Sequence, residues 1–262
     1  MAIVKVADRG TRGSNATGNA AVDMAAAGSI SVGNFLIARI AVDNTGASGA
    51  SPGLSVSDPR SNSWSSSSFL RNPNNVASDG VVAFMAYTSV VNAYTNGDDI
   101  TFNWTTGSPR SAIVIEEWSG ILGAGNGNGG AGATDGSGNM SLTCVATNLR
   151  ANSLLYVTAA AERESATWGA QDSDTLGAAW QDLTKDTTTG TTGTSAVSVY
   201  GGYKIIPSFE TQTWNNTTGN TSMNYAVLSN IFYPIEYGAT GASGTRGNKT
   251  TPNSRDRRWG GR

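Results

Sequence analysis

The chain repeats itself: four segments of its first half recur in the same order in its second half. The paired segments are 34–43 with 152–161, 80–90 with 195–205, 99–106 with 211–218, and 111–118 with 224–231. Their first residues are 118, 115, 112 and 113 positions apart, so the spacing is nearly constant. Each segment has the length and the Val, Ile and aromatic content of a β-strand. The repeat therefore predicts two strand sets of one kind, each of which needs the other to bury its apolar face.

The predicted fold is all-β: a single antiparallel β-sandwich of jelly-roll type, in which the two pseudo-repeated strand sets interleave over one core. A chain of 262 residues is long enough for one large β domain or two small ones. One sandwich is favoured, because two four-stranded domains would each have a thin core and exposed edges. Residues 19–27 are Ala-rich but lack an apolar stripe, so no amphipathic helix is predicted there.

Composition divides the chain into three regions: 1–33 as an N-terminal arm with a first strand, 34–235 as the sandwich, and 236–262 as a tail. The repeat units are placed at about 34–118 and 152–232. Residues 119–139 are rich in Gly and Asn, and are predicted to be a long connecting loop.

The tail has Gly at every third position from Gly238 to Gly247, but no Pro there, and this run is too short to hold a collagen-like triple helix alone. A basic stretch follows. We expect a flexible tail that docks on a partner through Arg255, Arg257, Arg258 and Trp259.

Composition also excludes several kinds of chemistry. The chain has no histidine, which removes Ser-His-Asp and Cys-His mechanisms and imidazole metal sites. Its single cysteine, Cys144, makes no intramolecular disulfide and is expected to be a small buried side chain. A net charge of −2 gives no general electrostatic case for nucleic acid or a membrane surface as partner. No secretory signal and no run of about 20 apolar residues is visible, so we expect synthesis in a host cytoplasm.

A glycan hydrolase or lyase would need a pair of carboxylates. Glu116 and Glu117 are adjacent on a predicted strand, so they point to opposite faces and cannot form the pair together. One of them could act with Glu162 or Glu164, which follow the equivalent strand of the second unit. The alternative is that they are structural, and the prediction is no catalytic residue; an enzyme of this kind would lose activity in Glu117→Gln.

Oxygen ligands at short spacing in Asp172-Ser-Asp174 and in 135–139 would suit calcium, although neither completes a calcium-loop pattern. Asx turns are the alternative, and no metal is predicted. The Gly-rich run from Gly123 to Gly130 opens no helix, so it is not a phosphate loop and no cofactor is predicted.

Six tryptophans stand at or near predicted strand ends. They are either exposed platforms that stack on sugar rings or large side chains that cap the core or an interface, and most are expected in the second role. The possible glycan or interface contacts are Trp64, Trp104, Trp168, Trp180 and Trp214.

Several short motifs occur in a familiar order: Asn34-Phe-Leu-Ile-Ala, Val56-Ser-Asp-Pro-Arg-Ser-Asn-Ser-Trp64, Val82-Ala-Phe-Met-Ala, Ile100-Thr-Phe, and Ile115-Glu-Glu-Trp-Ser-Gly120. Over roughly residues 30–235 the chain resembles a jelly-roll or concanavalin-like β-sandwich module of bacteriophage virion proteins and some bacterial surface proteins. Ser61 stands where that module has a glycine.

The resemblance implies a non-enzymatic virion structural protein: a capsid decoration protein, or a head-fibre, tail-fibre or minor tail component. Its expected partners are copies of itself, with a homotrimer favoured, and capsid or tail proteins of the same particle. An alternative is a carbohydrate-binding module that recognises host surface glycans at a tail or fibre tip. A glycan hydrolase or lyase is the second alternative.

Overall fold

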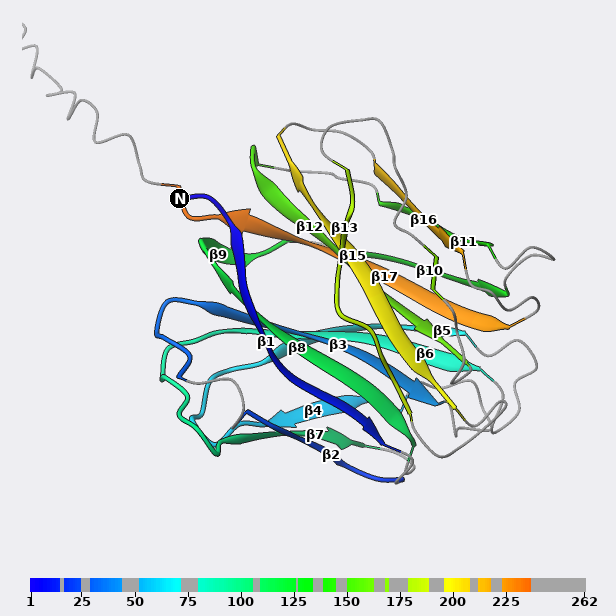
Figure 1. The fold of residues 1–262 in the computed structure, drawn as a ribbon, viewed down its shortest axis with the longest axis horizontal. Coiled ribbons are helices and arrows are strands. Elements are labelled where there is room, and N and C mark those ends of the chain that lie inside the picture. Colours follow the sequence, from blue (N-terminus) through cyan, green and yellow to red (C-terminus); the bar gives the residue numbers. More distant parts are fainter. Residues whose placement is uncertain are drawn as a thin grey trace, which may run out of the picture.

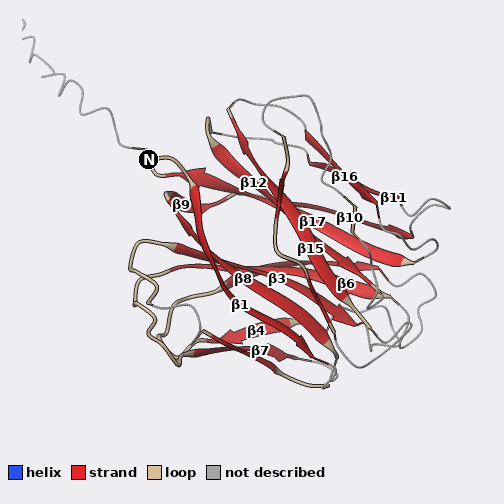
Figure 2. Ribbon diagram, viewed as in Figure 1, coloured by secondary structure: helices blue, strands red, loops and turns tan. Residues whose placement is uncertain are grey.

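The structure is a computed structural model, and all the secondary structure in its described residues is strand (Figures 1 and 2). It describes residues 1–14, 17–24, 29–43, 52–71, 80–105, 109–125, 127–133, 139–144, 150–162, 168–169, 179–188, 196–207, 212–217 and 223–236. The predicted all-β sandwich class is confirmed, because the strands form several antiparallel sheets that stack face to face.

The first repeat unit forms two sheets. A five-stranded sheet has the order β1-β8-β3-β6-β5, and a three-stranded sheet has the order β2-β7-β4. The strand bounds are β1 Val4–Ser14, β2 Ala20–Asp23, β3 Phe35–Asp43, β4 Leu54–Ser57, β5 Ser65–Arg71, β6 Val81–Ser89, β7 Asp99–Trp104 and β8 Ser111–Ser119.

The second unit also forms two sheets. A seven-stranded sheet has the order β10-β17-β12-β15-β13, with β9 beside β17 and β14 beside β15, and β11 pairs with β16. The bounds are β9 Ile121–Ala124, β10 Asn128–Ala133, β11 Asn139–Cys144, β12 Ser153–Ala161, β13 Gln181–Asp182, β14 Asp186–Thr187, β15 Ser198–Ile206, β16 Gln212–Thr217 and β17 Asn224–Pro234.

The two units have the same connectivity, which is the structural counterpart of the sequence repeat. The order β1-β8-β3-β6 of the first unit matches β10-β17-β12-β15 of the second, and the pair β2-β7 matches β11-β16. The four repeated segments are therefore β3 and β12, β6 and β15, β7 and β16, and β8 and β17.

The sheets stack in four layers, and each sheet consists almost entirely of strands from one unit (Figure 1). One apolar cluster lies inside the first unit, one inside the second, and the inter-unit cluster lies between the two large sheets. The expectation of strand sets interleaved over one core is thus wrong. Because β3 and β12 are buried on both faces, every one of their residues is buried.

The repeat is real, but its side chains align one residue away from the predicted register in the central strands. Phe35 pairs with Trp118, and Leu154 pairs with Phe232, and all four lie in the inter-unit cluster. Phe35 therefore corresponds to Leu154, whereas the sequence alignment matched it to Ser153. A shift of one residue along a strand moves every side chain to the opposite face.

The segments before and between the repeat units also contain strands. Residues 119–139 are not a long loop throughout, because β9 and β10 within them pair with β17 through their backbones. Together β9 and β10 take the place that β1 has in the first unit. The strand predicted within residues 1–33 is present as β1, the edge strand of the five-stranded sheet, and β2 is a further strand that pairs with β7.

One end of the molecule gathers the start of β3, the start of β12 and both ends of the described chain. Phe35 and Phe232 meet there with ring centroids 5.5 Å apart, and the amine of Met1 donates to the carbonyl of Ile235 at 2.7 Å. Figure 1 shows this end at the left, beside the N label. We call it the apolar end, for the side chains described next.

Candidate functional site

The apolar end carries the large apolar side chains that remain exposed among the described residues: Met1, Val4, Val6, Val32, Val91 and Leu122. Val4 pairs with Ser119 at the end of β8, close to the start of β9, which contains Leu122. Val32 and Val91 flank the backbone hydrogen bonds that join Gly33 and Asn34 to Val90. Exposed apolar side chains gathered in one region are typical of a contact surface.

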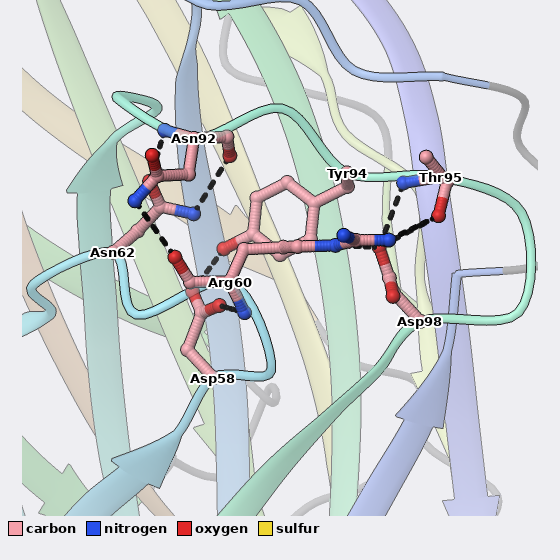
Figure 3. A network of polar contacts seen from close by, with 7 residues as sticks. All are labelled: Asp58, Arg60, Asn62, Asn92, Tyr94, Thr95 and Asp98. Carbon is pink, nitrogen blue, oxygen red and sulfur yellow. Dashed lines mark hydrogen bonds and ion pairs between the residues drawn. The ribbon is translucent and has the colours of Figure 1, made fainter.

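A polar network holds the loops of this end in place (Figure 3). Its centre is Asp58, which follows β4. The Asp58 carboxylate accepts a hydrogen bond from the hydroxyl of Tyr94 and one of 2.8 Å from the indole N–H of Trp64. It also accepts one of 2.7 Å from the backbone N–H of Arg60, which forms an Asx turn. Burial and then the bond to Asp58 raise the pKa of Tyr94 far above its usual value.

The same network ties the loop after β4 to the loop after β6. The side-chain oxygen of Asn62 accepts bonds of 2.9 Å from the backbone N–H groups of Val91 and Asn92. The Arg60 side chain donates to Asp98 at 2.7 Å and to the hydroxyl of Thr95. The bonds from Asn62 fix the backbone of the exposed Val91, so the network supports this part of the apolar end.

Ser61, inside this loop, has a φ of 59°, in the left-handed region that favours glycine. Ser61→Gly is therefore expected to stabilise the protein by about 0.5–1 kcal/mol, measured as a higher urea midpoint. Ser63→Gly is the matched control. Its φ is not positive, so the same change should lower the midpoint, and equal effects of the two changes would contradict this interpretation.

Glu116 and Glu117 point to opposite faces of β8, as predicted for neighbours on a strand. Glu117 faces the first unit, where Arg9 donates to its carboxylate at 2.5 Å and Asn34 donates to its other oxygen. Two motifs of the resemblance, one with Asn34 and one with Glu117, therefore meet in a structural contact. The side chain of Glu117 is 1% exposed.

Glu116 faces the second unit and belongs to a buried polar cluster between the large sheets, in which an ion pair of the first unit meets Tyr156 and Thr184 of the second. Arg39 of β3 donates to Glu116 at 2.5 Å, and both side chains are fully buried. Tyr156 of β12 donates its hydroxyl to Glu116 and accepts from Arg39 at 3.0 Å. Burial raises the pKa of Glu116, while the charge of Arg39 opposes that rise.

The cluster extends to the edge of the second unit. Arg39 also donates to the backbone carbonyl of Thr184 at 2.5 Å, and the hydroxyl of Thr184 donates to Asp8 of β1 at 2.7 Å. Gly201 of β15 lies beside the Arg39 side chain, and a Cβ there would run into the carbonyl of Val157. The arrangement joins the two units by directional bonds within an otherwise apolar contact.

Glu162 is buried and accepts a bond of 2.6 Å from Asn224. Glu164 lies outside the described residues. The carboxylates of Glu116, Glu117 and Glu162 are therefore each bound by other side chains of the protein. This arrangement differs from that of a glycan hydrolase, in which two carboxyl groups face each other across a sugar.

Asp43, at the end of β3, is buried near Arg110, and burial raises the pKa of its carboxyl from 3.8 to about 6. The folded protein therefore holds this proton more tightly than the unfolded chain does. The resulting stability is fully present below about pH 4 and is lost as the pH rises through 6. The loss is at most about 3 kcal/mol. We expect Asp43→Asn to flatten the dependence of unfolding free energy on pH between 4 and 7, measured in urea.

Asp99→Asn is the matched control for this prediction, because Asp99 is exposed. It should leave the profile unchanged. A profile of Asp43→Asn that runs parallel to that of the unchanged protein would contradict the assignment.

The tryptophans are core residues rather than platforms. Trp104, Trp118, Trp168, Trp180 and Trp214 are at most 8% exposed. Trp64 is half-buried against the first-unit cluster, and its indole is bound by Asp58. A sugar ring stacks on an aromatic face that is exposed to solvent. The structure shows no such set of exposed tryptophans among the described residues.

The remaining predicted sites have mixed outcomes. Cys144 is buried as expected, and burial raises the pKa of its thiol to about 11. Several predicted site residues lie outside the described residues: Asp172, Asp174, residues 135–138, and the expected docking residues Arg255, Arg257, Arg258 and Trp259. Within the described ranges, no group of three or more Cys, Asp or Glu side chains is placed to hold a metal ion. Nor does that part of the chain contain a helix long and apolar enough to cross a membrane.

Comparison with protein-family models, with curated proteins and with solved structures finds no match.

Proposed function

We propose that the protein is a non-enzymatic structural component of a bacteriophage particle, either a capsid decoration protein or a head-fibre or tail-fibre component. In this proposal it self-associates, as a trimer, and docks on capsid or tail proteins of the particle. The observation that carries the proposal is the contrast between its carboxylates and its apolar side chains. Glu116, Glu117 and Glu162 are bound by structural partners, whereas the exposed large apolar side chains of the described residues gather at one end.

The strand order supports a jelly-roll assignment. In the first unit β1 pairs with β8, β2 with β7 and β3 with β6, so the chain wraps back on itself from both ends. The second unit wraps in the same way through β10 with β17, β11 with β16 and β12 with β15. Double-sheet jelly rolls are common in viral capsid proteins and lectins, so the fold alone leaves both docking and sugar binding open.

The motifs of the resemblance support a role in building the body. Asn34 contacts Glu117, and Asp58 contacts Trp64, so residues of four motif positions bind one another. A module whose recurring residues stabilise its own loops suits a protein that is repeated many times on a particle. Its specificity then comes from the surface that the loops present.

Quantitative mass spectrometry of purified phage particles from the source tests the proposal. A structural component is expected at a fixed copy number per particle, in a simple ratio to the major capsid or tail protein, and it should survive washing in high salt. Absence from particles while the protein is plainly expressed in the host would contradict the proposal.

A carbohydrate-binding function is the second candidate, and one cleft favours it. The cleft, of about 420 Å³, is lined by Trp168, Tyr200, Asp182 and Lys185, together with Gly169, Leu183 and Thr184. The Trp168 and Tyr200 rings lie 4.9 Å apart but are largely buried, so a glycan would bind this cleft through the exposed Asp182 and Lys185 and not by stacking on a ring. The hydroxyl of Tyr200 donates to Asp182. Binding on a glycan array that is lost in Asp182→Ala would favour this candidate, whereas an array without signal would exclude it for the glycans displayed.

A further inference from the structure

A groove of about 750 Å³ opens at the apolar end, where the first and last described residues meet. It is lined by Met1, Ala2, Ile3, Ala151, Asn152, Ile205, Pro234, Ile235 and Glu236. The backbone of Ile235 forms one wall: its N–H donates to Gly120 at 2.8 Å and its carbonyl accepts from Met1. The lining is mostly apolar, with Glu236 as its acidic side chain.

We propose that the C-terminal segment of this chain, residues 255–262, occupies this groove, with the indole of Trp259 on the apolar lining. The occupant is the segment of the same chain, because Glu236, from which the tail continues, lines the groove. This contact forms within the isolated protein, so it does not depend on the proposed role in a phage particle.

The position of the groove supports this occupant. Glu236 is both a lining residue and the point where the chain continues toward its C-terminus. The 22 residues between Glu236 and Trp259 span about 75 Å when fully extended. Reach therefore does not limit the contact, and a tethered segment has a high effective concentration at a groove beside its own attachment point.

Charge favours association of the tail with the body. Residues 1–236 contain 11 Lys and Arg against 18 Asp and Glu, whereas residues 237–262 contain six against one. The body is thus acidic at −7 and the tail basic at +5, and opposite charges attract over about 8 Å at physiological salt. At the groove itself Glu236 is balanced by the Met1 amine, and Arg150 lies nearby, stacked over Tyr233, so the attraction comes from the charge of the whole body and not from the groove.

Trp259 differs from the other tryptophans of the chain. All six of the others are in the described body, where five are buried and Trp64 is half-buried. A tryptophan flanked by arginines in a polar segment is the type of residue that anchors protein contacts. Met1 is an exposed apolar residue of the groove lining, and an indole in the groove would cover its side chain, whereas the exposed Val4 and Leu122 lie outside the lining.

Disulfide crosslinking of the full-length protein tests the proposal. Ala151, an exposed lining residue, and Gly260, next to Trp259, are both changed to Cys in a Cys144→Ala background. Oxidation is expected to give rapid crosslinking within one monomer. A crosslinked dimer in its place would mean that a neighbour's tail fills the groove, and it would overturn the proposal. Adding Trp259→Ala should slow the crosslinking about ten-fold.

Ser66→Cys with Gly260→Cys is the matched control, because Ser66 is exposed on the edge strand β5. Equal rates for the Ala151 and Ser66 pairs, or no effect of Trp259→Ala, would overturn the proposal. A second measurement needs no cysteine: the fluorescence of Trp259, taken as the difference between the protein and Trp259→Phe, should be blue-shifted and shielded from acrylamide. A spectrum of a fully solvated indole would overturn the proposal too.

Discussion

Replacing Glu116 by Met should destabilise the protein by about 3–5 kcal/mol, because Arg39 would remain buried without its carboxylate partner. Arg39 is fully buried and donates to Glu116, to Tyr156 and to the carbonyl of Thr184. One of its terminal nitrogens already lacks a partner, so the guanidinium has little to replace the lost bonds. Urea unfolding of the single variant measures the loss.

The double variant Arg39→Met with Glu116→Met separates charge burial from packing. Apolar side chains of similar size can replace a buried ion pair at little cost, so the double variant should be more stable than Glu116→Met alone. The single variant Arg39→Met should lose stability as the pH rises, since burial raises the pKa of Glu116 and an unpaired carboxyl is tolerated only when protonated. A double variant less stable than both single variants would contradict the interpretation.

Trp118→Ala is the second change expected to have a large effect, with a loss of about 3–5 kcal/mol. Trp118 comes from the first unit, is fully buried, and packs on Tyr203 and Tyr156 of the second unit with ring centroids 4.9 and 5.9 Å away. Because the contact joins the units, hydrogen exchange should accelerate in β12 as well as in β8. Exchange measured by mass spectrometry locates the effect.

Trp118→Phe is the control for this prediction. The indole N–H of Trp118 is buried without a hydrogen-bond partner, so phenylalanine keeps the ring contact and removes an unsatisfied donor. We expect a loss of less than about 1.5 kcal/mol. Accelerated exchange confined to the first unit in Trp118→Ala would mean that the two units unfold independently.

The strand positions could be predicted from the sequence because the pattern of apolar residues is local. The repeated segments correspond to β3, β6, β7 and β8 and to their partners in the second unit. The register that relates β3 to β12 could not be predicted. Both strands are buried on both faces, so they lack the alternation of apolar and polar residues that would align them. The sequence repeat therefore aligns Phe35 with Ser153, whereas the structure relates it to Leu154.

The layers and the edge strands were harder to predict for two physical reasons. A continuous apolar run indicates burial on both faces, but it does not say which sheet covers each face. The Gly-rich β9 and β10 pair through backbone groups, so their sequence carries little side-chain signal. Long-range pairing with β17 decides their structure, and local propensity does not.

For the candidate site, the sequence indicated the residue types but not their partners. Arg39 is the one charged residue in the apolar run from Phe35 to Val42, but the sequence does not show that it contacts Tyr156 of the other unit. The tryptophans were placed near strand ends, and the structure shows that most of them face the cores. The clustering of Val4, Val32 and Val91 at one end needed the fold, because these residues are far apart in the chain.

Cryo-electron microscopy of purified particles tests the functional proposal most directly. The predicted result is density for a four-layer β body at regular positions on the capsid or on a fibre, attached through the apolar end that carries Val4 and Leu122. Particles that lack the protein, or that hold it by the opposite end with the apolar end in solvent, would contradict the account.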